Sequence, residues 1–425
     1  MDKKDYDVIV CGGGPAGIIA ATTAARNGAT TAIIERHAFL GGLASAGLVA
    51  PISEFRKNGH FIIKGFPWEF IERIASLGGA ITDYPNGNIP FDAEIYKLAA
   101  DRFTADAGVE LFFNTTLTGC RTEQIADRTR IQSICCSHFT GPFELAAEYY
   151  IDCTGDAMLS WYAGVPMQKF ADVQPASLCL RIGNVDTDHL ENTRLMEHGK
   201  KYSNQRIRTI LEKLKSAGER VPQFGGPWFQ QDIQDGIVYA NMTRSAVSLV
   251  NPKETSEMEA RLREDAFILF NLLKKHVPEF RDSRLIQCAV QAGYRETRRI
   301  VGRHLLTGRE LMDAVHFDDS IACSAHPVDI HRSGDTQQKV VFLEREGFIP
   351  YRSLYAQSHK NLLTAGRCVS ADKEAIASIR VQAPCMAMGQ AAGTAAALCL
   401  DGATDVTDLD TALLRQRLAA QGAII

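Results

Sequence analysis

A strand–turn–helix–strand pattern at the N-terminus constrains the fold of this chain most strongly. Residues 7–11 form a short apolar run bounded by charge, as in a strand buried on both faces. A glycine-rich turn follows at 12–17, residues 18–27 predict an alanine-rich helix closed by Gly28, and residues 30–34 predict a second strand. This order predicts an α/β fold with a mostly parallel, doubly wound, Rossmann-like sheet.

The turn has the spacing of a dinucleotide-binding fingerprint. Gly12 permits the tight turn, Gly14 lets the backbone approach a pyrophosphate, and Gly17 lets the helix pack close to the sheet. The free N–H groups and the dipole at the helix start favour phosphate groups. We therefore expect Pro15 and Ala16, which lie in the turn just before the helix, to lie beside the phosphates as well.

An acidic residue follows the second strand at the expected place. Glu35 lies 18 residues after Gly17 and precedes Arg36. Its carboxylate is placed to accept hydrogen bonds from ribose hydroxyls and would repel a 2′-phosphate, which disfavours NADP. The fingerprint alone does not distinguish the remaining dinucleotides.

Small-residue segments farther along the chain extend the predicted binding site. Residues 149–153 and 361–365 predict further strands, and a long small-residue helix is expected from about 383 to 400. The further residues expected to contact the cofactor are Gly41, Gly42, Leu43, Ala44, Ser45, Thr154, Gly155, Asp156, Gly366, Arg367, Ala383, Met386, Gly389 and Gln390.

With these segments and those at 294–302 and 349–354, the chain resembles the glutathione-reductase-type FAD flavoproteins. Within them it is similar to the bacterial FAD-dependent oxidoreductase family, which is related to the fumarate reductase flavoproteins. The resemblance implies FAD as cofactor. It also implies that the last long helix directs its N-terminus at the flavin pyrimidine ring, where it would stabilise negative charge on the reduced ring. Arg380 would then lie close to the flavin.

An arginine-rich segment at 295–303 has two interpretations. Arg295 and Arg298 can belong to a solvated charge run or an internal salt-bridge network. Alternatively, an arginine here gives an oxygen-rich substrate paired hydrogen bonds.

The segment 326–331 combines His326, Asp329 and His331. In an extended chain the two histidines would point to opposite faces, which disfavours a metal site. Asp329 and His331 share a face, and such a pair can move the proton that accompanies hydride transfer. The alternative is a polar strand edge. The related folds also imply that Tyr351 and Arg352 face the gap between flavin and substrate.

A chain of 425 residues is too long for one ordinary core. We expect an FAD-binding domain assembled from 1–165 and 341–425, with an α+β substrate domain inserted at 166–340. Within the insert we expect helices near 191–216 and 257–276, and a capping box at 307–310.

Composition excludes several classes of function. The net charge is −4 with both signs interspersed, so neither nucleic acid nor a membrane surface is an expected partner. The chain shows no signal peptide and no apolar run of about 20 residues, which predicts a cytoplasmic protein. The 11 cysteines include no C-x-x-C pair, so no metal site or iron–sulfur cluster is expected.

These features predict hydride transfer between flavin N5 and a polar small molecule. Dehydrogenation of a hydroxylated or carboxylated compound is the first expectation, and reduction of an activated double bond is the second. Because no second fingerprint supplies an NAD(P)H site, electrons enter and leave through substrates or through a separate electron-transfer partner. A flavin monooxygenase and a flavoprotein subunit of an electron-transfer complex are the alternatives. The oligomeric state stays open, and a homo-oligomer is possible.

Overall fold

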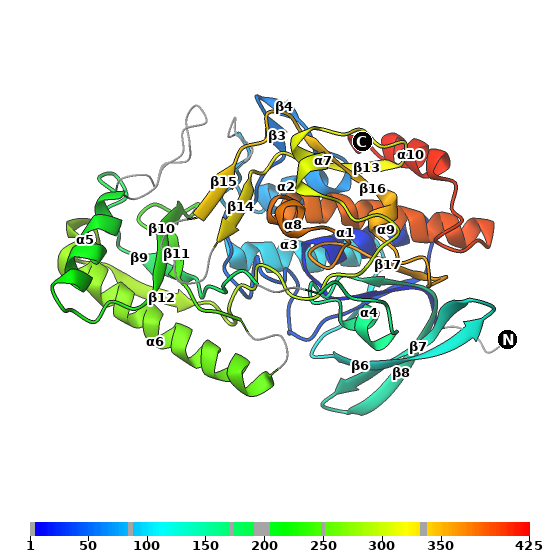
Figure 1. Ribbon diagram of the computed structural model, residues 1–425, viewed down its shortest axis with the longest axis horizontal. Helices are drawn as coiled ribbons and strands as arrows, with labels where there is room; N and C mark the ends of the chain where they lie inside the picture. Colours follow the sequence, from blue (N-terminus) through cyan, green and yellow to red (C-terminus); the bar gives the residue numbers. More distant parts are fainter. Residues whose placement is uncertain (1–4, 84–87, 170–172, 191–204, 248–250, 332–337) are drawn as a thin grey trace.

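A mostly parallel sheet forms the centre of one half of the molecule (Figure 1). The computed structural model describes residues 5–83, 88–169, 173–190, 205–247, 251–331 and 338–425. The strand order is β5-β2-β1-β8, with β17 beside β8, and these neighbours pair in parallel. The bounds are β1 (Tyr6–Cys11), β2 (Thr31–Ile34), β5 (Glu110–Phe112), β8 (Gly141–Asp152) and β17 (Leu362–Thr364). The strands expected near 7–11, 30–34, 149–153 and 361–365 are therefore confirmed.

Strand β8 takes part in two arrangements. Its first half pairs antiparallel with β7 (Arg128–His138), which pairs with β6 (Thr116–Ile125). Its second half, from Ala147 to Asp152, runs parallel to β1. The sequence predicts only this second half, because the apolar run that marks a strand buried on both faces begins there.

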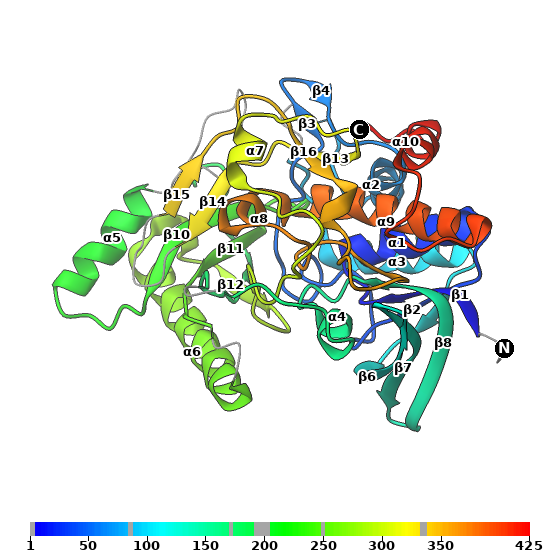
Figure 2. The same ribbon diagram turned by 45° about the vertical axis from the view of Figure 1, so that its right-hand side comes forward.

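Helices α1 (Pro15–Arg26), α3 (Ala93–Asp106) and α9 (Gln382–Gly402) lie together on one face of the sheet (Figure 2). Two glycines let α9 approach α1: a Cβ at Gly389 would lie 2.3 Å from the carbonyl oxygen of Ala16, and one at Gly393 would lie 2.3 Å from that of Ala20. Although α9 is long and apolar enough to cross a bilayer, it is almost entirely buried, as a core helix is. Around it pack α2 (Phe66–Ser76) and α10 (Thr411–Ala420).

A second, antiparallel sheet lies at the other end of the molecule, on the left in Figure 1. Its order is β10 (Phe224–Gln231), β11 (Val238–Thr243), β9 (Leu180–Gly183) and β12 (Arg284–Cys288). Helices α5 (Gln205–Ser216) and α6 (Pro252–His276) pack beside it.

Both helices expected in this region have other bounds in the structure. Helix α6 begins before the expected residue 257 because the Asn251 side chain accepts a hydrogen bond from the Lys253 N–H and caps the helix earlier. Helix α5 covers the end of the helix expected at 191–216, and residues 191–204 lie outside the described residues.

A buried ion triad joins the second sheet to helix α3. Arg181 of β9 donates to Asp232 at 2.8 Å and to Asp92 at 2.7 Å. Because Asp92 also caps α3 through its other carboxylate oxygen, the second sheet is fixed to the helix layer of the first.

Short elements surround the two sheets. They are β3 (Arg56–Lys57), β4 (His60–Phe61), α4 (Met158–Tyr162), α7 (Gly308–Met312), β13 (Ser320–Ser324), β14 (Val328–His331), β15 (Gln338–Val341), β16 (Gly347–Pro350) and α8 (Lys373–Ile379). The capping box of Thr307 and Glu310 is confirmed at the start of α7. The expected domain boundary at 340 falls inside β15, which pairs with β14, so this hairpin spans it.

Candidate active site

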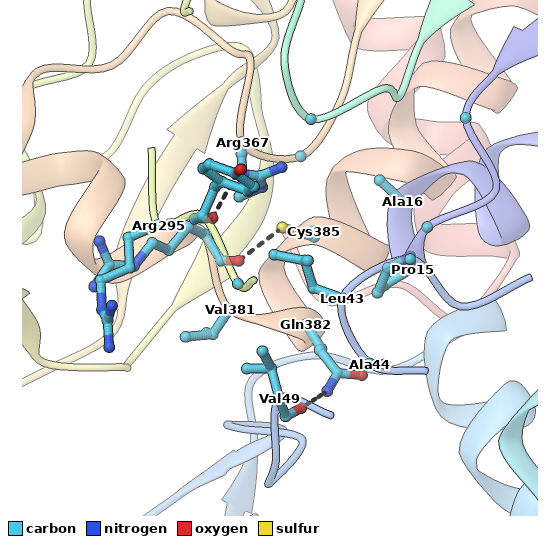
Figure 3. A pocket seen from close by; sticks show the side chains of 18 of the residues that line it. Pro15, Ala16, Leu43, Ala44, Val49, Arg295, Arg367, Val381, Gln382 and Cys385 are labelled. Atoms are coloured by element: carbon cyan, nitrogen blue, oxygen red, sulfur yellow. Dashed lines mark hydrogen bonds between the residues drawn. The ribbon is translucent and has the colours of Figure 1, made fainter. Parts of the chain in front are cut away.

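One cavity joins the carboxyl ends of the parallel strands to the second sheet, as expected for a ligand site in a doubly wound fold (Figure 3). At the end that we call the cofactor end it is lined by residues expected to bind the dinucleotide: Gly12, Gly14, Pro15, Ala16, Glu35, Arg36, Gly42, Leu43, Ala44, Thr154, Gly155, Gly366 and Arg367. At the arginine end it is lined by candidate catalytic residues: Arg295, His326, Asp329, His331 and Arg380.

The fingerprint glycines have separable structural roles. Gly12 has a φ of +100°, and a Cβ there would lie 2.6 Å from the Cys153 carbonyl oxygen. A Cβ on Gly17 would lie 1.9 Å from the carbonyl oxygen of Gly12, so Gly17 serves packing and does not line the cavity. At Gly14 the nearest atom to an added Cβ is 3.9 Å away. This open space in front of the backbone fits a pyrophosphate at the start of α1.

Glu35 is held in place by the backbone around it. Its carboxylate accepts hydrogen bonds from the N–H groups of Gly13, at 2.7 Å, and His37, at 2.9 Å. Each carboxylate oxygen has further acceptor capacity, and the residue lines the cavity while being only 6% exposed. The buried, oriented carboxylate fits the ribose of the FAD that the sequence implies.

Three predicted cofactor residues support the site from behind. The Gly41 N–H donates to the Gly13 carbonyl, and the Ser45 hydroxyl donates to the Leu40 carbonyl, which fixes the loop whose other residues face the cavity. Asp156 accepts from Arg367 at 3.3 Å, and Arg367 also donates to the Tyr294 carbonyl at 2.6 Å. Neither Gly41, Ser45 nor Asp156 is part of the cavity lining.

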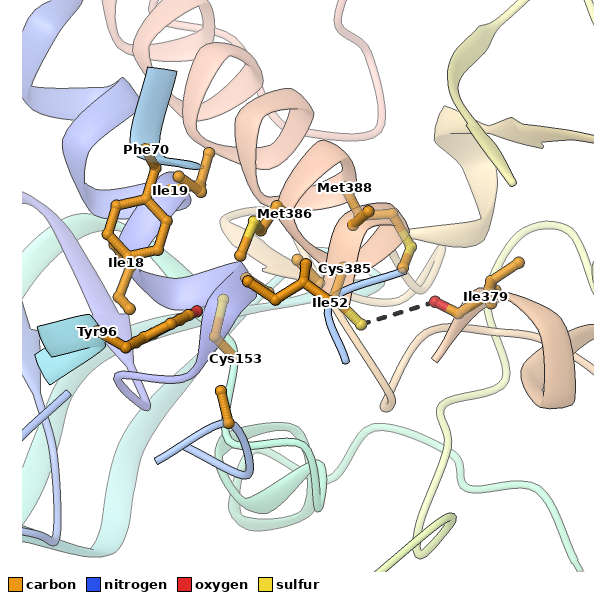
Figure 4. Close-up of a cluster of buried hydrophobic side chains, with 14 of the residues drawn as sticks. Ile18, Ile19, Ile52, Phe70, Tyr96, Cys153, Ile379, Cys385, Met386 and Met388 are labelled. Carbon is orange, nitrogen blue, oxygen red and sulfur yellow. Dashed lines mark hydrogen bonds between the residues drawn. The ribbon is translucent and has the colours of Figure 1, made fainter. Parts of the chain in front are cut away.

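The start of α9 reaches the cavity through a different face from the one predicted. The lining residues are Val381, Gln382 and Cys385. The expected residues Ala383, Met386, Gly389 and Gln390 are buried away from it. Met386 belongs to the apolar cluster of Figure 4, and Gln390 donates to Gln421 at 3.2 Å. The helical period separates these faces: Gly389 meets α1, Met386 three residues before it faces the core, and Cys385 four residues before it faces the cavity.

The arginine-rich segment fits both interpretations, because some of its arginines make internal contacts and one lines the cavity. Arg299 forms a buried ion pair with Glu296 at 2.6 Å. Arg298 does not line the cavity; it lies over the Trp161 ring, with its guanidinium carbon 4.9 Å from the ring centre. Arg295 alone lines the cavity, and its Nη1 donates to the Ser177 hydroxyl at 3.0 Å.

Asp329 and His331 share one face of β14, as predicted. His331 Nε2 lies 3.0 Å from Asp329 Oδ2, and Arg244 Nη2 lies 2.7 Å from His331 Nδ1. Because a guanidinium only donates, Nδ1 must accept, so the proton of the imidazole is on Nε2 and points at Asp329. Burial and the charges of Arg295 and Arg244 lower the pKa of His331 well below its usual value. His331 is therefore a neutral connector with both nitrogens occupied.

Asp329 stays ionised in this arrangement. Burial acts to raise its pKa, but the hydrogen bond from His331 and the charge of Arg380 together hold the pKa well below its usual value. Arg380 contacts the same strand, since its Nη2 donates to the Asp329 carbonyl at 2.8 Å.

His326 also lines the cavity, contrary to the expectation of opposite faces. The strand begins only at Val328, so the alternation of an extended chain does not apply to the preceding His326 and Pro327. His326 Nδ1 lies 2.9 Å from the Pro327 carbonyl and must donate to it, which leaves Nε2 as a free acceptor with no hydrogen bond to the described residues. Burial, reinforced by the positive charge of Arg380, lowers the pKa of His326, so the ring is neutral.

Tyr351 and Arg352 do not reach the cavity. The Tyr351 hydroxyl donates to the Val406 carbonyl at 2.8 Å inside the core. Arg352 pairs with Asp318 and Asp319, each at 3.4 Å. The expectation that they face the reacting groups is wrong, because β16 ends in a turn that directs both side chains away from the cavity.

Several cavity residues carry no signal in the sequence. They include Ser177, Asn241 and Gln291, and behind them the buried Arg244. All come from the region of the second sheet, and only the fold brings them to the glycine turn. Among the described residues no group of three or more histidine, cysteine or acidic side chains is arranged to hold a metal ion.

The chain is similar to several known proteins. The chain is 28% identical over 172 residues to the thiamine thiazole synthase of Methanococcus maripaludis, matching 36% of this chain and about 58% of that relative's length. Similar solved structures include a geranylgeranyl bacteriochlorophyll reductase-like protein from Thermoplasma acidophilum, with 15% identity, a TM-score of 0.46 and coverage of 98% of this chain and 83% of that one. Another is a myxobacterial chondrochloren halogenase, with 12% identity, a TM-score of 0.48 and coverage of 98% and 78%.

The family model described as FAD dependent oxidoreductase matches residues 7–418, which is nearly the whole chain. The chain belongs to the FAD-dependent oxidoreductase family.

Proposed function

We propose that this enzyme transfers a hydride between flavin N5 and a carbon of a polar small molecule bound at the arginine end of the cavity. The FAD-binding domain would comprise 1–165 and 341–425, and the substrate domain 166–340. Support comes from the continuity of one cavity that carries a dinucleotide fingerprint at one end and a neutral histidine among arginines at the other.

The free Nε2 of His326 is the observation that carries the proposal. When a hydroxylated carbon gives up its hydride, the hydroxyl proton needs an acceptor. A neutral imidazole whose Nδ1–H is fixed on the Pro327 carbonyl presents Nε2 for this purpose. In the reverse direction the same nitrogen returns the proton. FAD, when bound, supplies the acceptor or donor of the hydride.

The surroundings stabilise the charge that develops. The start of α9 lines the cavity through Val381 and Gln382, and its dipole favours negative charge there. Asp329, His331 and Arg244 form a fixed chain that holds the arginine end in one arrangement.

The test is anaerobic bleaching of the FAD-loaded enzyme by a panel of hydroxy acids, alcohols and polyols. We expect at least one compound to bleach the flavin at a rate that His326→Gln lowers about 100-fold or more. The matched control is His138→Gln, in the exposed hairpin between β7 and β8. If no compound of the panel bleaches the flavin, or if the two substitutions act alike, this proposal is wrong.

A flavin monooxygenase is the second candidate, because a neutral base such as His326 serves equally to deprotonate a phenol. Oxygen uptake with incorporation of labelled oxygen into the product, together with rapid NAD(P)H oxidation, would favour this reaction. Anaerobic bleaching by a substrate alone would favour hydride transfer.

A further inference from the structure

Three guanidinium groups converge at the arginine end. Arg244 Nη1 and Arg295 Nη1 donate to the same Ser177 hydroxyl oxygen, at 2.9 and 3.0 Å. Arg244 also contacts His331, and Arg380 contacts Asp329 of the same strand. After burial, the charges of Arg244 and Arg380 are the next causes that lower the pKa of Arg295, and the charge of Arg380 also lowers the pKa of Arg244.

Among the described residues, Asp329 is the acidic group whose charge acts on all three cations. The charge of Glu296 also acts on Arg380, but Glu296 is itself paired with Arg299. The other acidic residue of the cavity lining, Glu35, is held at the cofactor end by Gly13 and His37. Because guanidinium groups keep their charge in proteins and both histidines are neutral, the described part of the cluster carries two excess positive charges.

Hydrogen-bond donors in the cluster also lack acceptors. Arg380 Nη1 is buried and has no partner among the described residues, although Nη2 is satisfied by the Asp329 carbonyl. Arg295 makes its hydrogen bonds to described residues through Nη1 alone, which leaves Nη2 and Nε for a ligand. Both side chains line the cavity, and Figure 3 shows Arg295 beside Val381 at the side opposite Pro15 and Ala16.

From these contacts we propose that the substrate is an anion, whose carboxylate or phosphate oxygens accept hydrogen bonds from Arg295 and Arg380 while its reacting carbon lies near His326. Arg244 is a positioning residue, which holds His331 and Ser177 behind the two binding arginines. This inference rests on the proposed function, because it assigns the substrate class of the same site. It explains why so much positive charge is gathered in a largely buried place.

The experiment measures anion binding directly and does not require turnover. The oxidised FAD-loaded enzyme is titrated at constant ionic strength with sodium malonate, with sodium phosphate and with neutral malonamide, while the flavin absorption spectrum is recorded. We expect saturable spectral changes with malonate or phosphate, at concentrations at least about tenfold below any change with malonamide. Tighter binding of malonate would identify a carboxylate site, and tighter binding of phosphate would identify a phosphate site.

Arg380→Gln should weaken anion binding about tenfold or more, with the FAD content unchanged. The matched control is Arg352→Gln, which removes a surface arginine paired with Asp318 and Asp319, and which should leave anion binding unchanged. If Arg380→Gln does not fold, the comparison of malonate with malonamide on the unmodified enzyme still decides the matter.

The proposal is overturned if malonamide binds as tightly as the anions, if no anion binds because the flavin itself fills the cluster, or if Arg380→Gln binds anions like the unmodified protein. Failure of the proposed hydride transfer is distinguishable from this. Anion binding without bleaching by any compound would support the anion site and refute hydride transfer. Bleaching by neutral compounds alone would support hydride transfer and refute the anion site.

Discussion

The two ends of the cavity recognise their ligands by different means. At the cofactor end the ligand would meet backbone groups, the N-terminus of α1 and the open space at Gly14. Glu35 is the side chain oriented toward it. At the arginine end the lining is made of long charged side chains, such as Arg295 and Arg380, that are held by one another and by β14.

This difference has a structural origin. The cofactor end is built mainly from residues 12–16, 35–36 and 42–44, which are close along the chain and lie within one strand–helix–strand unit or directly after it. The arginine end combines Ser177 and Arg244 with residues from 295, 326–331 and 380, and it exists only when the second sheet is fixed to the first. A substitution at the cofactor end should therefore act on folding or FAD binding, and one at the arginine end on turnover.

The largest effect is expected from Gly17→Ala. The added Cβ would lie 1.9 Å from the Gly12 carbonyl oxygen, so the backbone must shift to accommodate it. We expect a loss of at least about 3 kcal/mol in the free energy of unfolding, and loss of FAD, measured by denaturant titration and by flavin content. The control is Gly119→Ala, where the nearest atom is 3.8 Å away, and it should change the free energy by no more than about 0.5 kcal/mol. An equal effect of the two would contradict the packing role of Gly17.

At the arginine end, His326→Gln should separate binding from turnover. We expect kcat to fall by about 100-fold to 10,000-fold, because the proton acceptor is lost, while the FAD content and the melting temperature stay close to those of the unmodified protein. Steady-state kinetics with a compound that bleaches the flavin would measure this. Loss of FAD together with activity would mean that the two ends are not separate.

The pH dependence of kcat/KM tests the same residue. Because burial lowers the pKa of His326 below its ordinary value of 6.5, the imidazole stays neutral as the pH falls through that value. Activity should therefore be lost only below pH 6.5, and this acidic limb should be absent in His326→Gln. An acidic limb centred above pH 6.5 would assign the titration to another group.

Glu35→Gln should weaken FAD binding about tenfold, since the amide removes the charge that strengthens hydrogen bonds to ribose hydroxyls. Titration of the apoprotein with FAD, followed by flavin fluorescence, would measure the dissociation constant. Turnover at saturating FAD should be unchanged. A lower kcat at saturating FAD would show that the cofactor end also acts on the reaction.

The smallest effect is expected where the two halves meet over the cavity. Arg36 Nη2 donates to Gln291 Oε1 at 2.7 Å on the surface. Arg36→Ala or Gln291→Ala should speed FAD release about twofold, because exposed polar contacts contribute little. The double substitution should add nothing further. Additive effects would show that the two side chains act independently.

The sequence predicts the cofactor end better than the arginine end, because the residues of the cofactor end are close along the chain and those of the arginine end are not. Gly12, Gly14 and Glu35 follow from local patterns, and so does the shared face of Asp329 and His331. The side of α9 that faces the cavity differs from the prediction, because the small size of Gly389 suits close helix packing as well as ligand contact. The sequence does not predict the role of Arg244, because its partner His331 lies 87 residues away along the chain.

The central claim is that FAD lies along the glycine turn, and Gly14→Val tests it most directly. Gly14 has a φ of −73° and no atom within 3.9 Å of an added Cβ, so the protein should fold with valine there, while the methyl groups fill the space in front of the turn. Titration of the apoproteins with FAD should show one flavin bound per unmodified chain and none to the folded variant. Equal binding by the two proteins would place the cofactor elsewhere and contradict this account.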